Sequence, residues 1–262
     1  MASDFELGGK RLSDFGMVLC KFGSDGLETI DIPKITFNTI SVLNGSKHEL
    51  INTEYEDCIT TTFQICKNRC NGNDMEITPT EFRRLTQWLC QKKFRKFKLF
   101  DKGYMDIYFE ATFNVSMIRM DNKLYGLELE MITNRPFALH DPKTITITNT
   151  VENGKHSIHD TSYEEGYIYP HTEITIAQNG DLNIYNAIED RSIHIANCVA
   201  GEIITMDYPI IQSSKSSHYI QDDFNWNFFR IANTYENSRN DLTISIPCTI
   251  KIEYFPIVKV GL

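Results

Sequence analysis

The chain has 262 residues, of which 41% are hydrophobic and 23% charged, a composition typical of globular proteins and unlike that of disordered ones. Its formal net charge of −9 argues against a surface that wraps nucleic acid by neutralising phosphates. No run approaches the roughly 20 apolar residues of a membrane helix. The N-terminus has neither a basic nor an apolar signal region, so we expect synthesis in a cytoplasm and no membrane partner.

Four segments of the first half have strand patterning. Ile35–Val42 alternates apolar and polar residues, as a half-buried strand does. Ile59–Cys66 is rich in β-branched residues, which favour strands. Tyr108–Met117 and Gly126–Met131 are two further strands, and the turn-forming residues of Met120–Lys123 predict a hairpin between them.

One helix, near residues 79–91, interrupts these strands. Thr78 suits the N-cap, Pro79 suits the first helical position, and Glu81 stands where a capping box needs an acid. Leu85 and Leu89 then recur at helical spacing, which predicts a buried stripe along one face.

A basic and aromatic segment follows the helix. Phe94 and Phe97 are interleaved with five cations: Lys92, Lys93, Arg95, Lys96 and Lys98. In one interpretation the segment binds nucleic acid. In the other it is a solvated or interface segment whose positive charge complements the negative end of the helix dipole. The net negative charge of the chain favours the second interpretation. We therefore predict that a subunit or partner interface lies at or near Phe94, Arg95, Phe97 and Lys98. Substituting Phe97 by Asp is then expected to weaken assembly and leave the C-terminal domain folded.

Two prolines within Asn134–Pro142 break the pattern and predict a boundary between domains 1–140 and 141–262. Strand patterning then resumes in six short segments: Lys143–Thr148, Glu173–Ala177, Asp181–Tyr185, Ser192–Ala196, Glu202–Met206 and Asp241–Ile246. Short, evenly spaced strands of this kind predict a β-sandwich. Asn179–Gly180–Asp181 predicts a hairpin turn between the second and third of them.

Patterns that would hold a metal ion are weak. Cys66 and Cys70 have metal-like spacing, but no second pair and no histidine follow at a ligand-like distance. His156 and His159 form a close pair in what we predict to be a polar loop, without a third ligand. We expect buried thiols, solvated histidines and no bound metal.

Catalytic patterns are also missing from the sequence. It contains no glycine-rich phosphate loop, no nucleophile elbow and no zinc-protease helix motif. Asp222 and Asp223 are adjacent, so their side chains point apart, unlike the facing carboxylates of a glycosidase. We predict a polar cap over an aromatic cluster there, and we expect no enzyme and no cofactor.

Three tyrosines, Tyr163, Tyr167 and Tyr169, share a face if they lie on one strand. Buried, they are core residues; exposed, they contact a partner protein or stack on sugar rings. We favour core or a protein contact. Together with Trp226 they support a second hypothesis, a carbohydrate-binding, adhesin-like module.

Several segments, taken in order along the chain, resemble the distal tail (Dit) family of siphophage-type tails. Those of the first half are Phe5–Gly16, Phe97–Phe100, Tyr108–Phe109 and Asn134–Ala138, and those of the second are Asn179–Ile184, Gly201–Ile204, Asp223–Arg230 and Asn240–Ile244. Their order and spacing, rather than any one motif, carry the resemblance.

The resemblance implies a mainly β fold with two domains. The first is a β-barrel or sandwich-like domain with one helix, whose copies form a hexameric ring; the second is a galectin-like β-sandwich on the periphery. The ring is the baseplate hub of a virion tail made in a bacterial host. It joins the tail tube protein to the tail-tip protein and leaves a channel through which DNA passes without specific binding. Similar proteins occur in prophage tails and tail-derived bacteriocins.

Overall fold

The computed structural model describes residues 4–22, 34–41, 47–69, 74–234 and 236–260, and its fold is mainly β, as predicted. Val42 and Cys70, which belong to two of the patterns above, lie outside these residues. The chain divides into two compact units. Unit 1 comprises Met1–Leu139 with Lys259–Leu262, and unit 2 comprises His140–Val258.

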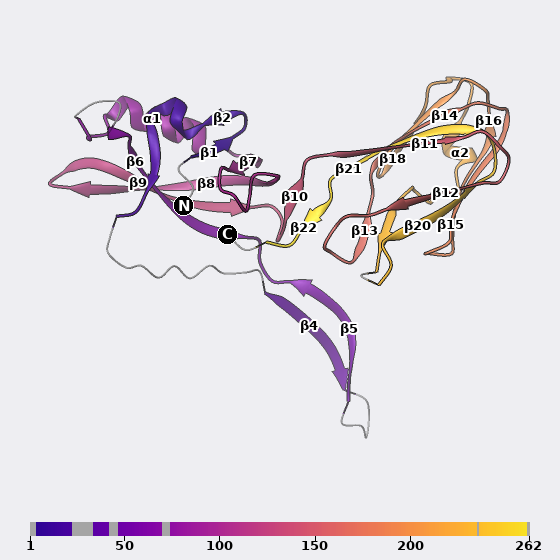
Figure 1. The fold of residues 1–262 in the computed structure, drawn as a ribbon, viewed down its shortest axis with the longest axis horizontal. Helices are drawn as coiled ribbons and strands as arrows, with labels where there is room; N and C mark the ends of the chain where they lie inside the picture. The colour runs from indigo at the N-terminus through magenta and orange to yellow at the C-terminus, as the bar shows by residue number, and fades with distance from the viewer. Residues whose placement is uncertain (1–3, 23–33, 42–46, 70–73, 235, 261–262) are drawn as a thin grey trace. The chain divides into compact units, whose positions relative to one another are not determined.

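Unit 1 is built on an open antiparallel sheet with the order β2-β1-β7-β8-β9-β6-β3 (Figure 1). The strands are β1 (Phe5–Leu7), β2 (Lys10–Arg11), β3 (Met17–Cys20), β6 (Thr60–Lys67), β7 (Arg95–Leu99), β8 (Ile107–Met120) and β9 (Lys123–Thr133). A short 3-10 helix, η1 (Leu12–Phe15), joins β2 to β3, and β10 (Ala138–His140) pairs with β8. The described strands do not close into a barrel.

The predicted hairpin between β8 and β9 is confirmed. β8 ends at Met120 and β9 begins at Lys123, and these two residues are paired. Asp121 and Asn122 between them have φ values of 50° and 63°. A two-residue hairpin turn of type I′ needs positive φ at both positions, which Asp and Asn tolerate better than most residues.

The predicted helix is α1 (Pro79–Leu89), and its cap is the one expected. The Glu81 backbone N–H donates to Thr78 Oγ1 over 3.3 Å, and Glu81 Oε2 accepts from the Thr78 backbone N–H over 2.7 Å. The helix lies against one face of the sheet (Figure 1). It packs there through Trp88, whose Nε1 donates to the Leu7 carbonyl over 3.0 Å. The Trp88 ring stacks on that of Phe5, with centroids 5.7 Å apart.

A two-stranded hairpin, β4 (Ile35–Ser41) and β5 (His48–Tyr55), makes up a separate sheet. Its strands pair only with each other among the described residues. The predicted strand is present, but it is not half-buried: the hairpin exposes five apolar side chains, namely Ile35, Phe37, Ile40, Leu50 and Ile51. Isolated hairpins of two strands are marginally stable in water.

Unit 2 is a β-sandwich of two antiparallel sheets. The first has the order β11-β21-β14-β17-β18: β11 (Lys143–Asn149), β14 (His171–Ile176), β17 (Ile203–Asp207), β18 (Ile210–Ser213) and β21 (Cys248–Tyr254). The second has the order β12-β20-β15-β16: β12 (Gly154–His159), β15 (Gly180–Asn186), β16 (Arg191–Cys198) and β20 (Arg239–Ile244). The remaining elements are β13 (Gly166–Ile168), which pairs with β19 (Ile231–Asn233), the short helix α2 (Ile220–Asp223) and β22 (Ile257–Val258).

The core of the sandwich comes from alternate residues of both sheets. Ile174 and Ile250 of the first sheet and Leu182 and Ile195 of the second are fully buried. Each strand therefore alternates buried and more exposed side chains, as the period-2 patterning predicted. All six predicted strands are present, and the β-sandwich is confirmed.

Two local predictions in this unit are wrong. The turn at Asn179–Gly180–Asp181 does not close a hairpin, because β14 pairs with β17 and β21 whereas β15 pairs with β16 and β20. The chain crosses here from one sheet to the other, and turn chemistry does not choose the strand partner. His156 and His159 lie on strand β12 rather than in a loop, and His156 Nε2 is 3.1 Å from Asn149 Oδ1.

Candidate functional site

Phe97, one of the four predicted interface residues, is a core residue instead. Its exposure is 0%, and its ring lies 5.3 Å from that of Phe5 and 5.5 Å from that of Phe113. Phe97 occupies the inward-facing position of β7, so its ring is not available to a partner. Lys98 faces the opposite way, half-buried, with its Cα paired to that of Glu6 in β1.

Phe94 and Arg95 lie at the surface where β7 begins. Phe94 is 44% exposed, and Arg95 Nε donates to Gln91 Oε1 over 2.9 Å. Arg95 also lines a groove of about 600 Å³ in unit 1. The charged residues of the groove are Lys10, Asp14, Arg84 and Arg95, a net positive set. An interface at Phe94, Arg95 and Lys98 stays a prediction.

Two of the three predicted tyrosines are joined through an arginine. The Arg230 guanidinium lies 3.7 Å from the centre of the Tyr167 ring and donates to the Tyr169 hydroxyl over 3.4 Å. Its other partner is Glu189, at 2.6 Å. Tyr163 is exposed, but no ring contact joins it to this group among the described residues.

The aromatic contacts continue beyond Tyr169. Its ring stacks on that of Tyr208, with centroids 4.3 Å apart, and Tyr208 packs edge-on against buried Phe228 at 5.4 Å. Trp226 reaches the same Phe228 ring, at 6.4 Å. These contacts form what we call the aromatic strip, whose exposed members are Tyr167, Tyr169, Tyr208 and Trp226. Tyr167 and Tyr169 are exposed and are therefore not core residues, whereas a protein contact through them stays a prediction.

Trp226 is held outward by its two neighbours. The side-chain amides of Asn225 and Asn227 both donate to the Ser192 carbonyl, each over 3.0 Å. Trp226 itself has a φ of 59° and is 57% exposed. A left-handed backbone costs a bulky residue about 1–2 kcal/mol. Residues held in strained conformations cluster at functional sites, so the exposed indole is a candidate contact residue.

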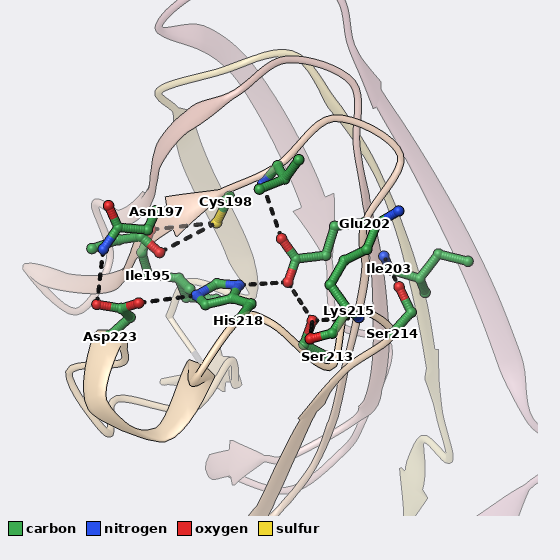
Figure 2. Close-up of polar contacts among 12 residues, drawn as sticks. Ile195, Asn197, Cys198, Glu202, Ile203, Ser213, Ser214, Lys215, His218 and Asp223 are labelled. Carbon is green, nitrogen blue, oxygen red and sulfur yellow. Dashed lines mark hydrogen bonds and ion pairs between the residues drawn. The ribbon is translucent and has the colours of Figure 1, made fainter.

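Beneath the surface of unit 2 lies a polar cluster centred on Glu202 and His218 (Figure 2). His218 Nδ1 lies 2.6 Å from Glu202 Oε1, and both side chains are almost completely buried. On the other side of the ring, His218 Nε2 is 3.2 Å from Asp223 Oδ2 without a well-aligned hydrogen bond. The same Glu202 carboxylate accepts from the Ser213 hydroxyl and from the Val199 backbone N–H. The cluster therefore ties the β16–β17 connection to β18 and to the segment that leads into α2.

Burial by itself raises the pKa of Glu202, but the hydrogen bonds that its carboxylate accepts lower the pKa by more. The bonds from Ser213, Val199 and His218 all favour the carboxylate and hold the pKa of Glu202 below its usual range. The carboxylate thus remains charged within the protein, where it fastens three segments of chain.

The polar cluster lacks the arrangement of a nucleophilic site. The Ser213 hydroxyl donates to a carboxylate and not to the imidazole, so the histidine is not placed to take its proton. Among the described residues, no group of His, Cys, Asp and Glu is placed to hold a metal ion. No helix among the residues that the structure describes is long and apolar enough to cross a membrane.

The sequence patterns did not point to His218, Glu202, Tyr208 or Arg230. His218 lies 16 residues from Glu202, and Arg230 lies 61 residues from Tyr169, so no local spacing brings them together. The one usable signal was the aromatic segment before Arg230, which predicted an aromatic cluster beneath Asp222 and Asp223. The sequence did not show which of those rings would be exposed.

Comparison with known proteins identifies the family. A model described as the phage tail protein N-terminal domain matches residues 1–135, and one described as the phage tail C-terminal domain matches residues 137–254. A search of the curated proteins found no match.

Among solved structures, the chain is similar to the Dit protein of phage SPP1, whose structure is described as a paradigm of the hub adsorption apparatus of phages that infect Gram-positive bacteria. The likeness covers 97% of this chain and 99% of that one, with a TM-score of 0.65 and 9% sequence identity, and at this identity it shows a shared fold. Because the two family models together span nearly the whole chain, the chain belongs to a family of phage tail proteins, and it has a Dit-like fold.

Proposed function

We propose that the chain is a structural subunit of a distal tail hub. In this proposal six copies form a ring through the N-terminal domain, residues 1–140, and carry the C-terminal sandwich, residues 141–262, on the periphery. The ring joins the tail tube protein to a tail-tip protein within the virion, and the protein has no catalytic role. Family membership and the likeness to a hub protein over both units support it.

The β4–β5 hairpin is the observation that carries the assembly step. Phe37 is 63% exposed and Ile51 is 66% exposed, on a hairpin that pairs with nothing else among the described residues. Burying such a side chain completely stabilises a protein by about 1.5–3 kcal/mol. A partner that covers the hairpin therefore gains substantial free energy, and in a homo-oligomer every subunit offers the same surface.

The charge of the chain is compatible with a channel for DNA. A net charge of −9 gives each subunit an acidic balance, and six copies multiply it. Like-charge repulsion keeps DNA from adhering to such a ring, so that DNA passes without specific binding.

The first test is the mass of the purified protein in solution over a range of concentrations, followed by electron microscopy of the same sample. Six copies of the 30.3 kDa chain give about 182 kDa. An annular particle of that mass with an open centre supports the proposal. A protein that stays monomeric at every concentration, and also when mixed with its tail tube protein, contradicts it.

A pair of variants then tests the hairpin itself. Phe37→Ser with Ile51→Ser removes two exposed apolar side chains, so unit 1 is expected to stay folded while the oligomer weakens. Met105→Ser is the matched control, because Met105 is an equally exposed apolar residue of unit 1 outside the hairpin. An oligomer of unchanged mass and affinity in the double variant removes the hairpin from the interface.

A further inference from the structure

We propose that the aromatic strip of unit 2 is a carbohydrate-binding site for an oligosaccharide of a cell surface. The inference goes beyond the hub role and does not depend on it. It rests on four exposed rings in a continuous set of contacts, on the fixed geometry of those rings and on the polar groups beside them.

The rings suit the apolar faces of sugars. A pyranose ring presents a face of C–H groups that packs flat against an aromatic ring, while its hydroxyls point outward to polar partners. The strip offers such rings in series, and each of the four residues is at least 38% exposed. Tyr208 and Trp226 both contact Phe228, which places their centroids at most about 12 Å apart. An oligosaccharide can therefore contact both rings at once.

The rings are held in position before a ligand arrives. Arg230 lies against Tyr167 and bonds Tyr169, and Glu189 fixes the guanidinium in turn. Tyr169 also stacks on Tyr208. A preorganised surface loses little side-chain freedom on binding, which favours affinity for a weakly binding ligand such as a sugar.

Trp226 is the most specialised residue of the strip. Its backbone adopts a left-handed conformation, and the two flanking asparagines anchor the segment to the Ser192 carbonyl. This arrangement keeps a large indole in solvent although buried Phe224 and Phe228 lie next to it. Packing alone does not account for an exposed indole on a strained backbone.

Hydrogen-bonding groups flank the rings. Asp207 precedes Tyr208, and its Oδ1 lies within hydrogen-bond distance of His171 Nδ1, at 2.7 Å on the exposed surface. Among the described residues, no hydrogen bond engages the hydroxyls of Tyr167 and Tyr208. Carboxylate, imidazole and phenol groups can all bond sugar hydroxyls, and a binding site needs only a few of them beside its apolar surface.

Charge argues against a nucleic acid as the occupant. Arg230 is paired with Glu189 and His171 with Asp207, so the strip presents no excess of cations for phosphates. The exposed faces are aromatic rings, three of which carry a hydroxyl. This mixture of ring faces and polar tips fits a sugar better than it fits the aliphatic core of a protein interface.

The test uses the full chain on an immobilised array of hexose and N-acetylhexosamine oligosaccharides, with any bound sugar then titrated in solution. Acrylamide quenching of tryptophan fluorescence gives a second readout, because Trp226 is 57% exposed and Trp88 only 6%. We expect a bound oligosaccharide to protect Trp226 from the quencher.

Three variants locate the site. Trp226→Ala and Tyr208→Ala are each expected to weaken binding about tenfold or more, as the loss of an aromatic contact implies. Tyr163→Ala is the matched control, an exposed tyrosine of the same unit outside the strip, and it is expected to bind as the unaltered protein does. Circular dichroism checks that all three variants are folded.

Three outcomes would overturn the proposal. The first is no binding to any sugar of the array, and the second is binding that survives both substitutions in the strip. The third is capture of another tail protein through these rings in place of a sugar, which would make the strip a protein-docking surface. A ring of the expected mass that binds no sugar would leave the hub proposal standing and remove only the carbohydrate site.

Discussion

Phe97→Ala is predicted to destabilise unit 1 rather than to remove a contact between subunits. The side chain is fully buried, and four aromatic rings surround it with centroids 5.3–6.4 Å away: Phe5, Phe63, Phe109 and Phe113. Replacing a buried phenylalanine by alanine costs about 3–5 kcal/mol, through lost burial and the cavity that remains. Tight aromatic packing places Phe97 near the upper end of this range, which corresponds to a fall in Tm of roughly 15 °C for a unit of this size.

The two tryptophans make the assay selective. Trp88 lies in unit 1, stacked against Phe5, and Trp226 lies in unit 2. A Trp226→Phe background leaves Trp88 as the fluorescent reporter, so urea unfolding followed by emission measures unit 1. Phe94→Ala is the matched control, since Phe94 is an exposed neighbour whose loss is expected to change the free energy of unfolding by less than about 0.5 kcal/mol.

Phe97→Asp is expected to abolish assembly by the same route, because it places a carboxylate in an aromatic core. Unit 2 is expected to remain folded in this variant, which is checked through Trp226 in a chain without the Trp226→Phe change. If Phe97→Ala unfolds at the same urea concentration as Phe94→Ala and yet lowers the mass of the oligomer, the core assignment fails and the interface hypothesis for Phe97 is restored.

Three further predictions concern acid, the helix cap and the thiols. The pKa of Glu202 is lower in the folded protein than its unfolded value of about 4.5, so the carboxylate stabilises unit 2 fully above that value and loses this effect as pH falls through the folded pKa. Glu202→Gln should therefore flatten the acid side of a curve of unit 2 stability against pH. An unchanged curve would contradict this role. Thr78→Ala removes the capping box of α1 and should cost unit 1 about 1 kcal/mol in urea unfolding, whereas Thr78→Ser should cost far less. Burial raises the pKa of Cys198 to about 11 and that of Cys248 to about 12, so both thiols should react with a thiol reagent only on unfolding. Exposed Cys58 should react in the native protein. Labelling of the native protein followed by mass spectrometry tests which cysteines are modified.

Features that short-range chemistry determines could be predicted from the sequence. The α1 cap needs only Thr78, Pro79 and Glu81 within four consecutive residues, and the β8–β9 turn needs only two residues that tolerate positive φ. The sandwich strands follow from alternation of buried and exposed residues within each strand. The interactions behind these features span four residues or fewer, so the sequence carries them directly.

Features that depend on distant partners could not be predicted. Phe97 stands in a run of cations that suggested a surface, and only the pairing of β7 between β1 and β8 turns its ring inward. The Asn179–Asp181 turn has hairpin chemistry, yet burial of Ile174 and Leu182 in facing sheets decides that the chain crosses over. The candidate site could not be predicted either, because Arg230 contacts Tyr167 and Tyr169 from a position about 60 residues further along the chain.

The pairing of β11 with β21 has a consequence for the order in which the chain folds. Thr148 is paired with Thr249, so two strands about a hundred residues apart must meet before the first sheet is complete. Contacts at such separation slow folding, because the intervening loop is ordered before the pairing stabilises it. During synthesis, unit 1 has most of its strands available while β21 is still inside the ribosome. The sandwich must wait until β21 has emerged, and until then its isoleucine-rich strands are exposed to misassociation.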